Sequence, residues 1–202
     1  MILHINPQNP QQRLIDQAVS ALRNGGLIAY PTDTTYGIGC DITNKRALEK
    51  ILQLKKDSQN KLVSFLCPDV SEISHYAKVS NYAYKTMKRL LPGPYTFVLD
   101  ASPLVPKLMI TKRKTTGIRV PDNEICHMLL RTLGNPIVNA SATTDTGTYF
   151  DDVSFLEERY KNIVDIVIDG GPAPNQPSSI ISLVQDKPEV LREGLGDTQL
   201  FQ

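Results

Sequence analysis

The chain has 202 residues, of which 41% are hydrophobic and 21% are charged, and its formal net charge at pH 7 is +1. This length suffices for one large domain with its own hydrophobic core, and the composition is that of a globular protein. Because the net charge is close to zero, overall charge does not indicate nucleic-acid binding, which would need a local basic patch.

Strand-like apolar runs alternate with helix-like segments up to about residue 170, and strands predominate after it. The expected strands are 3–5, 27–29, 61–67, 95–101, 115–121, 136–141, 164–171, 178–184 and 189–194. The expected helices open at Pro10, Thr43, Ser71 and Ser80, span 123–133 before Gly134, and cover 151–160. This order predicts an α/β (α+β) fold, in one domain over residues 1–202, with a mixed sheet covered by helices.

The stretch YPTDTTYGIGCD, residues 30–41, places a proline, four hydroxyl side chains and two glycines directly after a buried strand. Pro31 cannot donate a ladder hydrogen bond, so we expect the strand to lose its partner there. Ligands commonly bind at strand ends in sheets covered by helices. A threonine-rich turn that bonds to its own backbone explains the same residues. On this stretch alone both interpretations stay open.

Other predicted strands also end in small hydroxyl residues or cations, which bind carboxylates and phosphates. These residues are Lys112, Arg113, Lys114, Thr115, Thr116, Ser141, Thr143, Thr144, Ser178, Ser179 and Arg192. Residues 112–114 alone are more typical of a solvated loop. Arg119 lies between Ile118 and Val120 in an apolar strand, so it must point outward or find a partner. If these strand ends converge, they form a site for an anionic ligand.

Several classes of site have no pattern in this sequence. It contains no G-x-x-x-x-G-K-[ST], no G-x-G-x-x-G after a strand and no G-x-S-x-G. The three cysteines are far apart and odd in number, and the three histidines lack ligand spacing, so we interpret all six as structural or surface residues. No stretch approaches the ~20 apolar residues of a membrane span, so we expect a cytoplasmic protein with no membrane partner.

Six segments occur in a characteristic order along the chain. They are GGLIAYPTDTTYGIGCD, LLPGPYTFVLDA, TTGIRVPDN, VNASA, PSSIISL and VLREG. In this combination they resemble the YrdC/YciO family over nearly the whole chain. Details such as KRKTTGIRVP and REGLGD are more similar to the YciO branch. The resemblance implies a single YrdC-like domain with a twisted mixed sheet and a concave cleft.

The best-known members of that family are threonylcarbamoyl-AMP synthases, which join L-threonine, bicarbonate and ATP and release pyrophosphate. A partner system then transfers the activated group to adenosine 37 of tRNAs that read ANN codons. The resemblance therefore implies a nucleotidyltransferase with ATP as substrate and Mg²⁺ accompanying the nucleotide. It implies no catalytic side chain, because the chemistry relies on positioning and charge.

By motif position, the resemblance implies two sets of binding residues. Those for threonine are Thr32, Thr34, Arg119 and Ser178. Those for the nucleotide are Lys55, Lys56, Asn60, Thr115, Ser141 and Arg192. No protein metal ligand is implied.

Two positions depart from the synthase branch. Its K-x-R corresponds here to Lys55-Lys56-Asp57, and its S-x-N corresponds to Ser141-Ala142-Thr143. An acid at position 57 would repel a triphosphate. Losing one charged contact in a phosphate site costs ~1.5–3 kcal/mol, or roughly tenfold to over a hundredfold in affinity.

The departures keep an alternative open, which is binding of double-stranded RNA or tRNA without synthase activity. Relatives are described as duplex RNA binders through a basic concave surface. The candidate cations are Lys55, Lys56, Lys112, Arg113, Lys114, Arg119 and Arg192.

Overall fold

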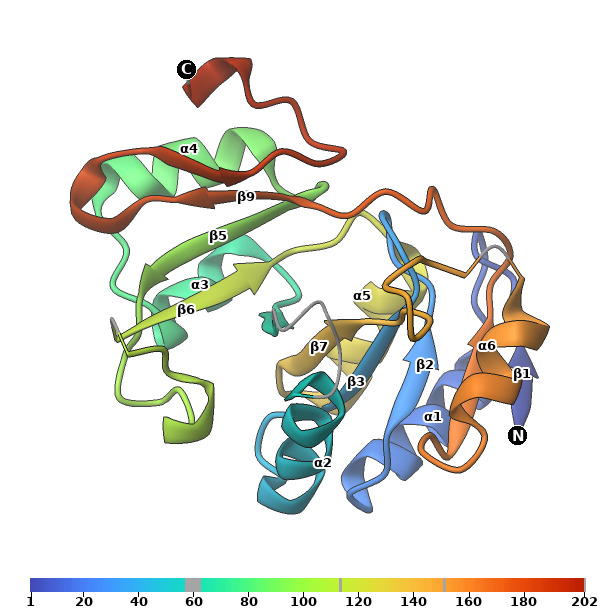
Figure 1. Cartoon of the computed structure of the whole chain (residues 1–202). Coiled ribbons are helices and arrows are strands. Elements are labelled where there is room, and N and C mark those ends of the chain that lie inside the picture. Colours follow the sequence, from blue (N-terminus) through green and yellow to red (C-terminus); the bar gives the residue numbers. More distant parts are fainter. Residues whose placement is uncertain (57–62, 113, 151, 202) are drawn as a thin grey trace.

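A computed structural model describes residues 1–56, 63–112, 114–150 and 152–201, without the side chain of Lys56. Its strands form one sheet in the order β1-β8-β2-β3-β7-β4-β6-β5-β9-β10 (Figure 1). The strands are β1 (Ile2–His4), β2 (Ile28–Tyr30), β3 (Gly37–Asp41), β4 (Ser64–Leu66), β5 (Tyr95–Asp100), β6 (Thr115–Arg119), β7 (Ile137–Ser141), β8 (Ile166–Asp169), β9 (Ser179–Ser182) and β10 (Glu189–Arg192). The helices are α1 (Gln12–Arg23), α2 (Lys45–Lys56), α3 (Val70–Tyr76), α4 (Asn81–Leu90), α5 (Glu124–Leu133) and α6 (Val153–Tyr160), with short 3₁₀ turns at Lys107–Met109, Val184–Asp186 and Gln199–Phe201.

The sheet mixes parallel and antiparallel pairs, which confirms the predicted fold class. Strands β1, β8 and β2 are parallel, while β3 pairs antiparallel with both β2 and β7. Three-residue β4 pairs antiparallel with β7 and parallel with β6, and so joins the two halves of the sheet. In Figure 1, strands β5, β6 and β9 run at an angle to β2 and β3. The sheet therefore bends near β4.

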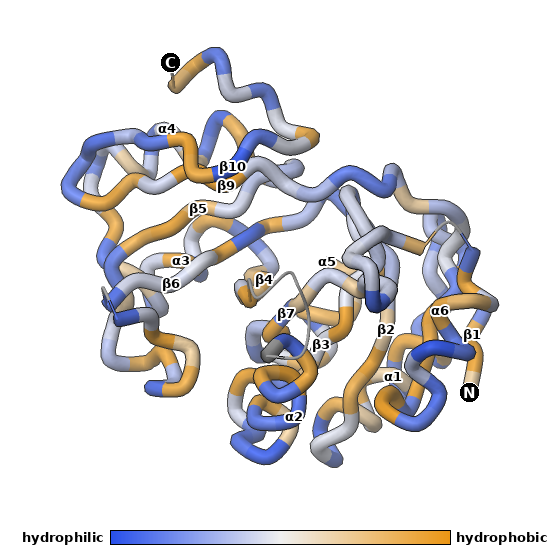
Figure 2. The backbone as a smooth tube through the Cα atoms, in the orientation of Figure 1, coloured by the Kyte–Doolittle hydropathy of each residue, from blue (hydrophilic) through white to orange (hydrophobic). Residues whose placement is uncertain are grey.

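Alternate residues of a strand face opposite sides of the sheet, and here both sides are covered. Ile28 and Tyr30 pack into the cluster formed with α1 and α5. Leu27 and Ala29 pack into the second cluster, which includes residues of α2, α3, α4 and α6. Figure 2 shows the resulting hydrophobic runs along β2 and β5. Among the described helices, none is both long and apolar enough to cross a membrane.

Truncating the core at β4 is expected to be costly. Phe65 is 0% exposed and meets the Tyr76 ring edge-on at 5.4 Å. We expect Phe65→Ala to lower the free energy of unfolding by about 3–5 kcal/mol, because it removes buried apolar area and leaves a cavity. Urea denaturation measures this loss. The matched control is Phe155→Ala, at a position that is 67% exposed, and a comparable loss there would contradict the assignment of the core.

Strand β3 was not predicted, because Gly37 and Gly39 carry none of the side chains that mark a strand. The structure shows why both glycines are needed. A Cβ on Gly39 would lie 2.7 Å from the Tyr30 ring, and one on Gly37 would collide with the Asn139 side chain. The bare backbone of β3 thus leaves room for the Tyr30 ring to cross it. The Tyr30 hydroxyl then donates to Asn139 Oδ1 at 2.8 Å.

Two of the predicted helix caps were wrong by one or two residues. Asn44, not Thr43, accepts the Ala47 N–H at 3.0 Å. Asp69, not Ser71, caps α3, since its carboxylate accepts the N–H groups of the first turn. In both cases an Asn or Asp oxygen takes the capping position, for which these side chains are well suited. The cap at Ser80 and the left-handed Gly134 after α5 were predicted correctly.

Candidate functional site

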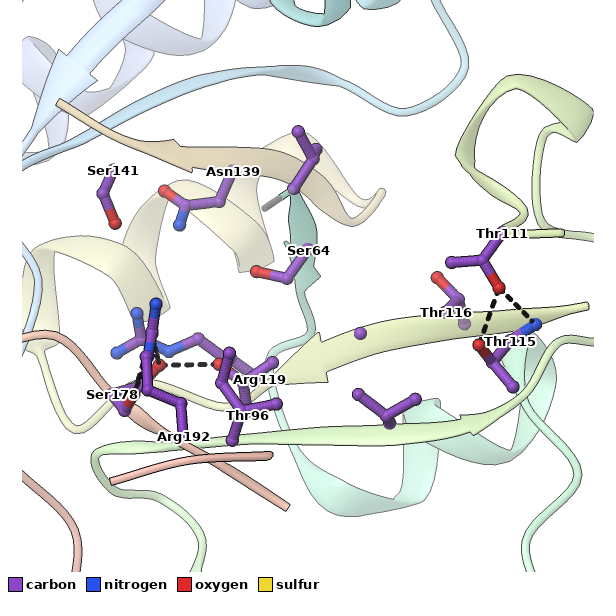
Figure 3. Close-up of a pocket in the computed structure, with 14 residues that line it drawn as sticks. Ser64, Thr96, Thr111, Thr115, Thr116, Arg119, Asn139, Ser141, Ser178 and Arg192 are labelled. Atoms are coloured by element: carbon purple, nitrogen blue, oxygen red, sulfur yellow. Dashed lines mark hydrogen bonds between the residues drawn. The ribbon is translucent and has the colours of Figure 1, made fainter. Parts of the chain in front are cut away.

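A cavity of about 110 Å³ lies at the bend of the sheet, where β4, β5, β6 and β7 meet (Figure 3). Its polar lining consists of Ser64, Thr96, Thr111, Thr115, Thr116, Arg119, Asn139, Ser141, Ser178 and Arg192. The described lining contains two arginines and no carboxylate. Pockets for drug-sized ligands measure roughly 300–1,000 Å³, so this cavity suits a smaller molecule. Its composition favours an anionic group.

Arg119 of β6 is 3% exposed, and it has found a partner, as the sequence required. Its Nη2 donates to Asp33 Oδ1 at 2.6 Å and to Thr34 Oγ1 at 3.1 Å. The pair is incompletely satisfied, because Arg119 Nε and Asp33 Oδ2 are buried with no hydrogen-bond partner. A buried unpaired donor is costly, so the Arg119–Asp33 pair is not fully compensated within the described residues.

Arg192 of β10 faces the same cavity and is held by Ser178. Its Nε and Nη2 donate to the Ser178 carbonyl oxygen at 3.1 and 2.8 Å. The Ser178 hydroxyl in turn shares a 2.7 Å hydrogen bond with Thr96. Burial lowers the pKa of Arg192, and the charge of Arg119 acts in the same direction. Two positive charges thus repel each other across this space, which an anionic ligand would relieve.

Thr32 and Thr34 do not line the cavity. Thr32 Oγ1 donates to the Thr35 carbonyl at 2.6 Å and accepts the N–H groups of Thr34 and Thr35. The turn therefore does bond to its own backbone, as one of the two interpretations required. Thr34 Oγ1 also accepts a hydrogen bond from Arg119, so the turn helps to position this arginine. A direct contact of either threonine with a ligand stays a prediction.

Lys55 of α2 lies beside a second cavity, of about 260 Å³, which it lines with Ser141, Thr143 and Arg159. Its Nζ donates to the Ser141 carbonyl at 3.2 Å. Burial lowers the pKa of Lys55 to about 8. Ser141 lines both cavities, so the two adjoin along the end of β7.

The structure thus gathers five of the ten proposed binding residues around the first cavity. These are Thr115, Arg119, Ser141, Ser178 and Arg192. Motif position assigns Arg192 to the nucleotide set. In the structure, however, its guanidinium donates to the carbonyl oxygen of Ser178, which belongs to the threonine set. Asn60 lies outside the described residues, as does the side chain of Lys56.

The cations of the RNA alternative do not all share one exposed surface. Lys55 and Arg119 are buried, and Arg192 is half-buried. Lys112 and Lys114 are exposed, and they lie in the segment between Thr111 and Thr115, two residues that line the first cavity. Arg113 lies outside the described residues.

Sequence reasoning missed two residues that shape the site. Asn139 is 4% exposed and lines the first cavity. The sequence could have predicted a role for Asn139, because an amide inside the apolar run PIVNA needs a hydrogen-bond partner as much as Arg119 does. Asp33, the partner of Arg119, had no comparable signal, because it stands in a polar turn 86 residues away.

Comparison with known proteins relates the whole chain to one family. A family model described as "Telomere recombination" and named for Sua5, YciO and YrdC matches residues 20–194. The "Uncharacterized protein YciO" of Escherichia coli K12 is 42% identical over 200 residues, which cover 98% of this chain and 97% of that protein. The crystal structure of E. coli YciO matches with a TM-score of 0.93 at 40% identity, over 100% of this chain and 99% of that chain.

Two more distant relatives have names that state an activity or a ligand. The "Threonylcarbamoyl-AMP synthase" of Vibrio vulnificus YJ016 is 28% identical over 159 residues, which cover 77% of this chain and 86% of that protein. Sua5 of P. abyssi, in a crystal structure with L-threonine, is 27% identical with a TM-score of 0.87, over 96% of this chain and 57% of that chain. Since the family model covers most of the sequence and YciO matches nearly all of it, the chain belongs to the Sua5/YciO/YrdC family, which includes threonylcarbamoyl-AMP synthases.

Proposed function

We propose that this protein binds L-threonine and ATP and joins them with bicarbonate into threonylcarbamoyl-AMP, releasing pyrophosphate. One observation carries the proposal. A cavity with two arginines and no carboxylate in its described lining adjoins, at Ser141, a second cavity lined by Lys55. This arrangement supports a small anion and a polyphosphate bound side by side. The product belongs to the pathway of tRNA modification at adenosine 37.

The first cavity fits threonine in both size and charge. Arg119 and Arg192 both line the cavity, and their guanidinium groups can donate to its carboxylate, in the way that arginines bind carboxylates elsewhere. The hydroxyls of Thr96 and Ser178 and the Asn139 amide supply polar partners for the rest of the molecule. The threonine complex of P. abyssi Sua5 supports this choice of ligand.

The second cavity, of about 260 Å³, suits the phosphates of the nucleotide. The charged Lys55 amine and the hydroxyls of Ser141 and Thr143 can donate to phosphate oxygens. No group of three His, Cys, Asp or Glu side chains in the described part of the chain could hold a metal ion. A Mg²⁺ ion would arrive with ATP as part of the substrate, held largely by phosphate oxygens and water.

The reaction requires two anions to meet. The threonine amine combines with bicarbonate to give a carbamate, with loss of water. A carbamate oxygen then attacks the α-phosphorus, and the bond to pyrophosphate breaks. Arg119, Arg192 and Lys55 reduce the repulsion between the two anions. The cavity walls hold the carbamate and the α-phosphate close together in a reactive orientation.

Isothermal titration tests the substrate assignment. We expect L-threonine to bind more tightly than L-valine, which has nearly the same shape without the hydroxyl, because the polar lining would be left unpaired. MgATP should bind at a separate site, so that saturating threonine does not displace it. Equal affinity for threonine and valine, or direct competition between threonine and ATP, would contradict the proposal.

ATP affinity is expected to fall as pH rises through about 8. The pKa of Lys55 is lowered to about 8, so the amine is charged below this pH and neutral above it. Only the charged form attracts phosphate, so affinity should drop by up to about tenfold per pH unit above pH 8. Titrations from about pH 7 to about pH 9.5 measure this profile. The Lys55→Met variant should bind ATP weakly, and its ATP affinity should show no inflection near pH 8. An inflection retained in this variant would point to another titrating group.

RNA binding is the competing proposal, and it is favoured by Lys112 and Lys114, which are exposed and lie in the segment between Thr111 and Thr115 of the cavity lining. Gel-shift titration against duplex RNA and tRNA at two salt concentrations tests it. Backbone binding weakens steeply with salt. Salt-sensitive RNA binding that Lys112→Ala/Lys114→Ala abolishes, in a protein that binds no ATP, would favour this alternative over synthesis.

A further inference from the structure

We propose that Arg159, on α6, supplies a guanidinium that binds the outer phosphates of the nucleotide, in a chain where Asp57 stands in place of the arginine of the K-x-R segment. The inference rests on the proposed function and adds one residue to it. It concerns a residue that none of the motifs singles out.

The position of Arg159 carries the proposal. The second cavity brings together Lys55 from the altered K-x-R segment, Ser141 and Thr143 from the altered S-x-N segment, and Arg159 from α6. Lys55 of the altered K-x-R segment and Thr143 of the altered S-x-N segment therefore line one cavity. Asp57, which replaces the signature arginine, removes a positive charge from this region of the sequence and adds a negative one. Arg159 provides a guanidinium in the same cavity.

The end of α6 is fixed to the wall of this cavity. The Tyr160 hydroxyl accepts the Thr143 N–H at 3.1 Å and donates to the Thr143 carbonyl at 2.7 Å. Tyr160 is buried, and its ring lies 5.4 Å from the Arg159 guanidinium carbon. The neighbouring Arg159 is therefore held close to the Ser141–Thr143 segment, and its guanidinium is pre-positioned over an aromatic ring.

Arg159 has a partner that a phosphate can replace. Its Nη2 donates to Asp145 Oδ1 at 2.5 Å, and the two side chains are 39% and 82% exposed. Ion pairs between exposed groups are weak, because water competes for both charges. A polyphosphate carries more charge and accepts two parallel hydrogen bonds from arginine. Asp145 thus neutralises Arg159 in the free protein and competes with the nucleotide for it.

The test compares AMP, ADP and ATP, each with Mg²⁺, by isothermal titration against the full-length protein. For the wild type, affinity should increase with the number of phosphates. We expect Arg159→Ala to weaken ATP binding at least tenfold while leaving AMP nearly unchanged. Arg159→Lys should recover part of the loss. Asp145→Asn should strengthen ATP binding, because it removes the competing carboxylate.

Arg89→Ala is the matched control. Arg89 is an exposed arginine on α4, and its removal changes the net charge equally. Figure 1 shows α4 and α6 at opposite ends of the molecule. Thermal melting of each variant establishes that it is folded. Equal losses for Arg89→Ala and Arg159→Ala, or a uniform loss for all three nucleotides, would overturn the role of Arg159. If the wild type binds ATP and Arg159→Ala binds it equally well, this inference fails and the proposed function stands. If the wild type binds no nucleotide, both fail.

Discussion

Arg119→Ala is expected to abolish threonine binding and to lower the free energy of unfolding by about 3–5 kcal/mol. Both effects arise from one side chain. Arg119 faces the cavity where the threonine carboxylate is proposed to bind, and it also neutralises buried Asp33 at 2.6 Å. Removing one partner of a buried ion pair leaves an uncompensated charge, which accounts for the loss of stability. Urea denaturation and titration with threonine measure the two effects.

A double variant separates the structural effect from the binding effect. Asp33→Asn in the Arg119→Ala background removes the unpaired carboxylate, so most of the lost stability should return. Threonine binding should not return, because the guanidinium is still missing. If the double variant binds threonine with wild-type affinity, Arg119 acts only through folding and the proposed carboxylate site is wrong.

Gly194→Ala is expected to weaken threonine binding at least tenfold and to destabilise the fold by about 1–3 kcal/mol. A Cβ on Gly194 would lie 2.6 Å from the Ser178 carbonyl oxygen, which is the atom that holds Arg192. The Gly194 N–H also donates to Ser179 Oγ at 3.0 Å. Because these neighbours are largely backbone, the segment after β10 must move away and take Arg192 with it.

The matched control lies on β10, the strand that precedes Gly194. Glu189→Ala, at the exposed start of β10, should change neither threonine affinity nor stability appreciably. If Gly194→Ala retained wild-type threonine affinity, then the arrangement of Arg192 on Ser178 would be irrelevant to binding.

Most of the fold could be predicted from the pattern of apolar residues along the chain. Among the residues that the structure describes, apolar runs and helix periodicity placed nine of the ten strands and all six helices, because each of those elements buries a face. Strand β3 was not predicted because its two glycines lack the side chains typical of a strand. These glycines leave space for the Tyr30 ring, a contact that exists only once the strands are paired. Local hydrogen bonds decided the caps at Asn44 and Asp69, where neighbouring hydroxyl residues offered equally good candidates.

The site was only partly predictable for a related reason. A cation in an apolar strand predicted that Arg119 would need a partner, but not that this partner would be Asp33. Likewise, nothing local linked Lys55 to Arg159, which share a cavity although they lie far apart in the sequence. Motif order pointed to the family, whereas the pairing of charges depends on which strand ends the bent sheet brings together.

The most direct test of the central claim is product formation. The purified protein is incubated with MgATP, L-threonine and ¹³C-bicarbonate, and the mixture is analysed by mass spectrometry alongside a pyrophosphate assay. The account predicts threonylcarbamoyl-AMP carrying the label, with an equal amount of pyrophosphate, and neither product from Arg119→Ala/Asp33→Asn. Pyrophosphate release that does not require threonine, or no labelled adenylate from a protein that binds both substrates, would contradict it.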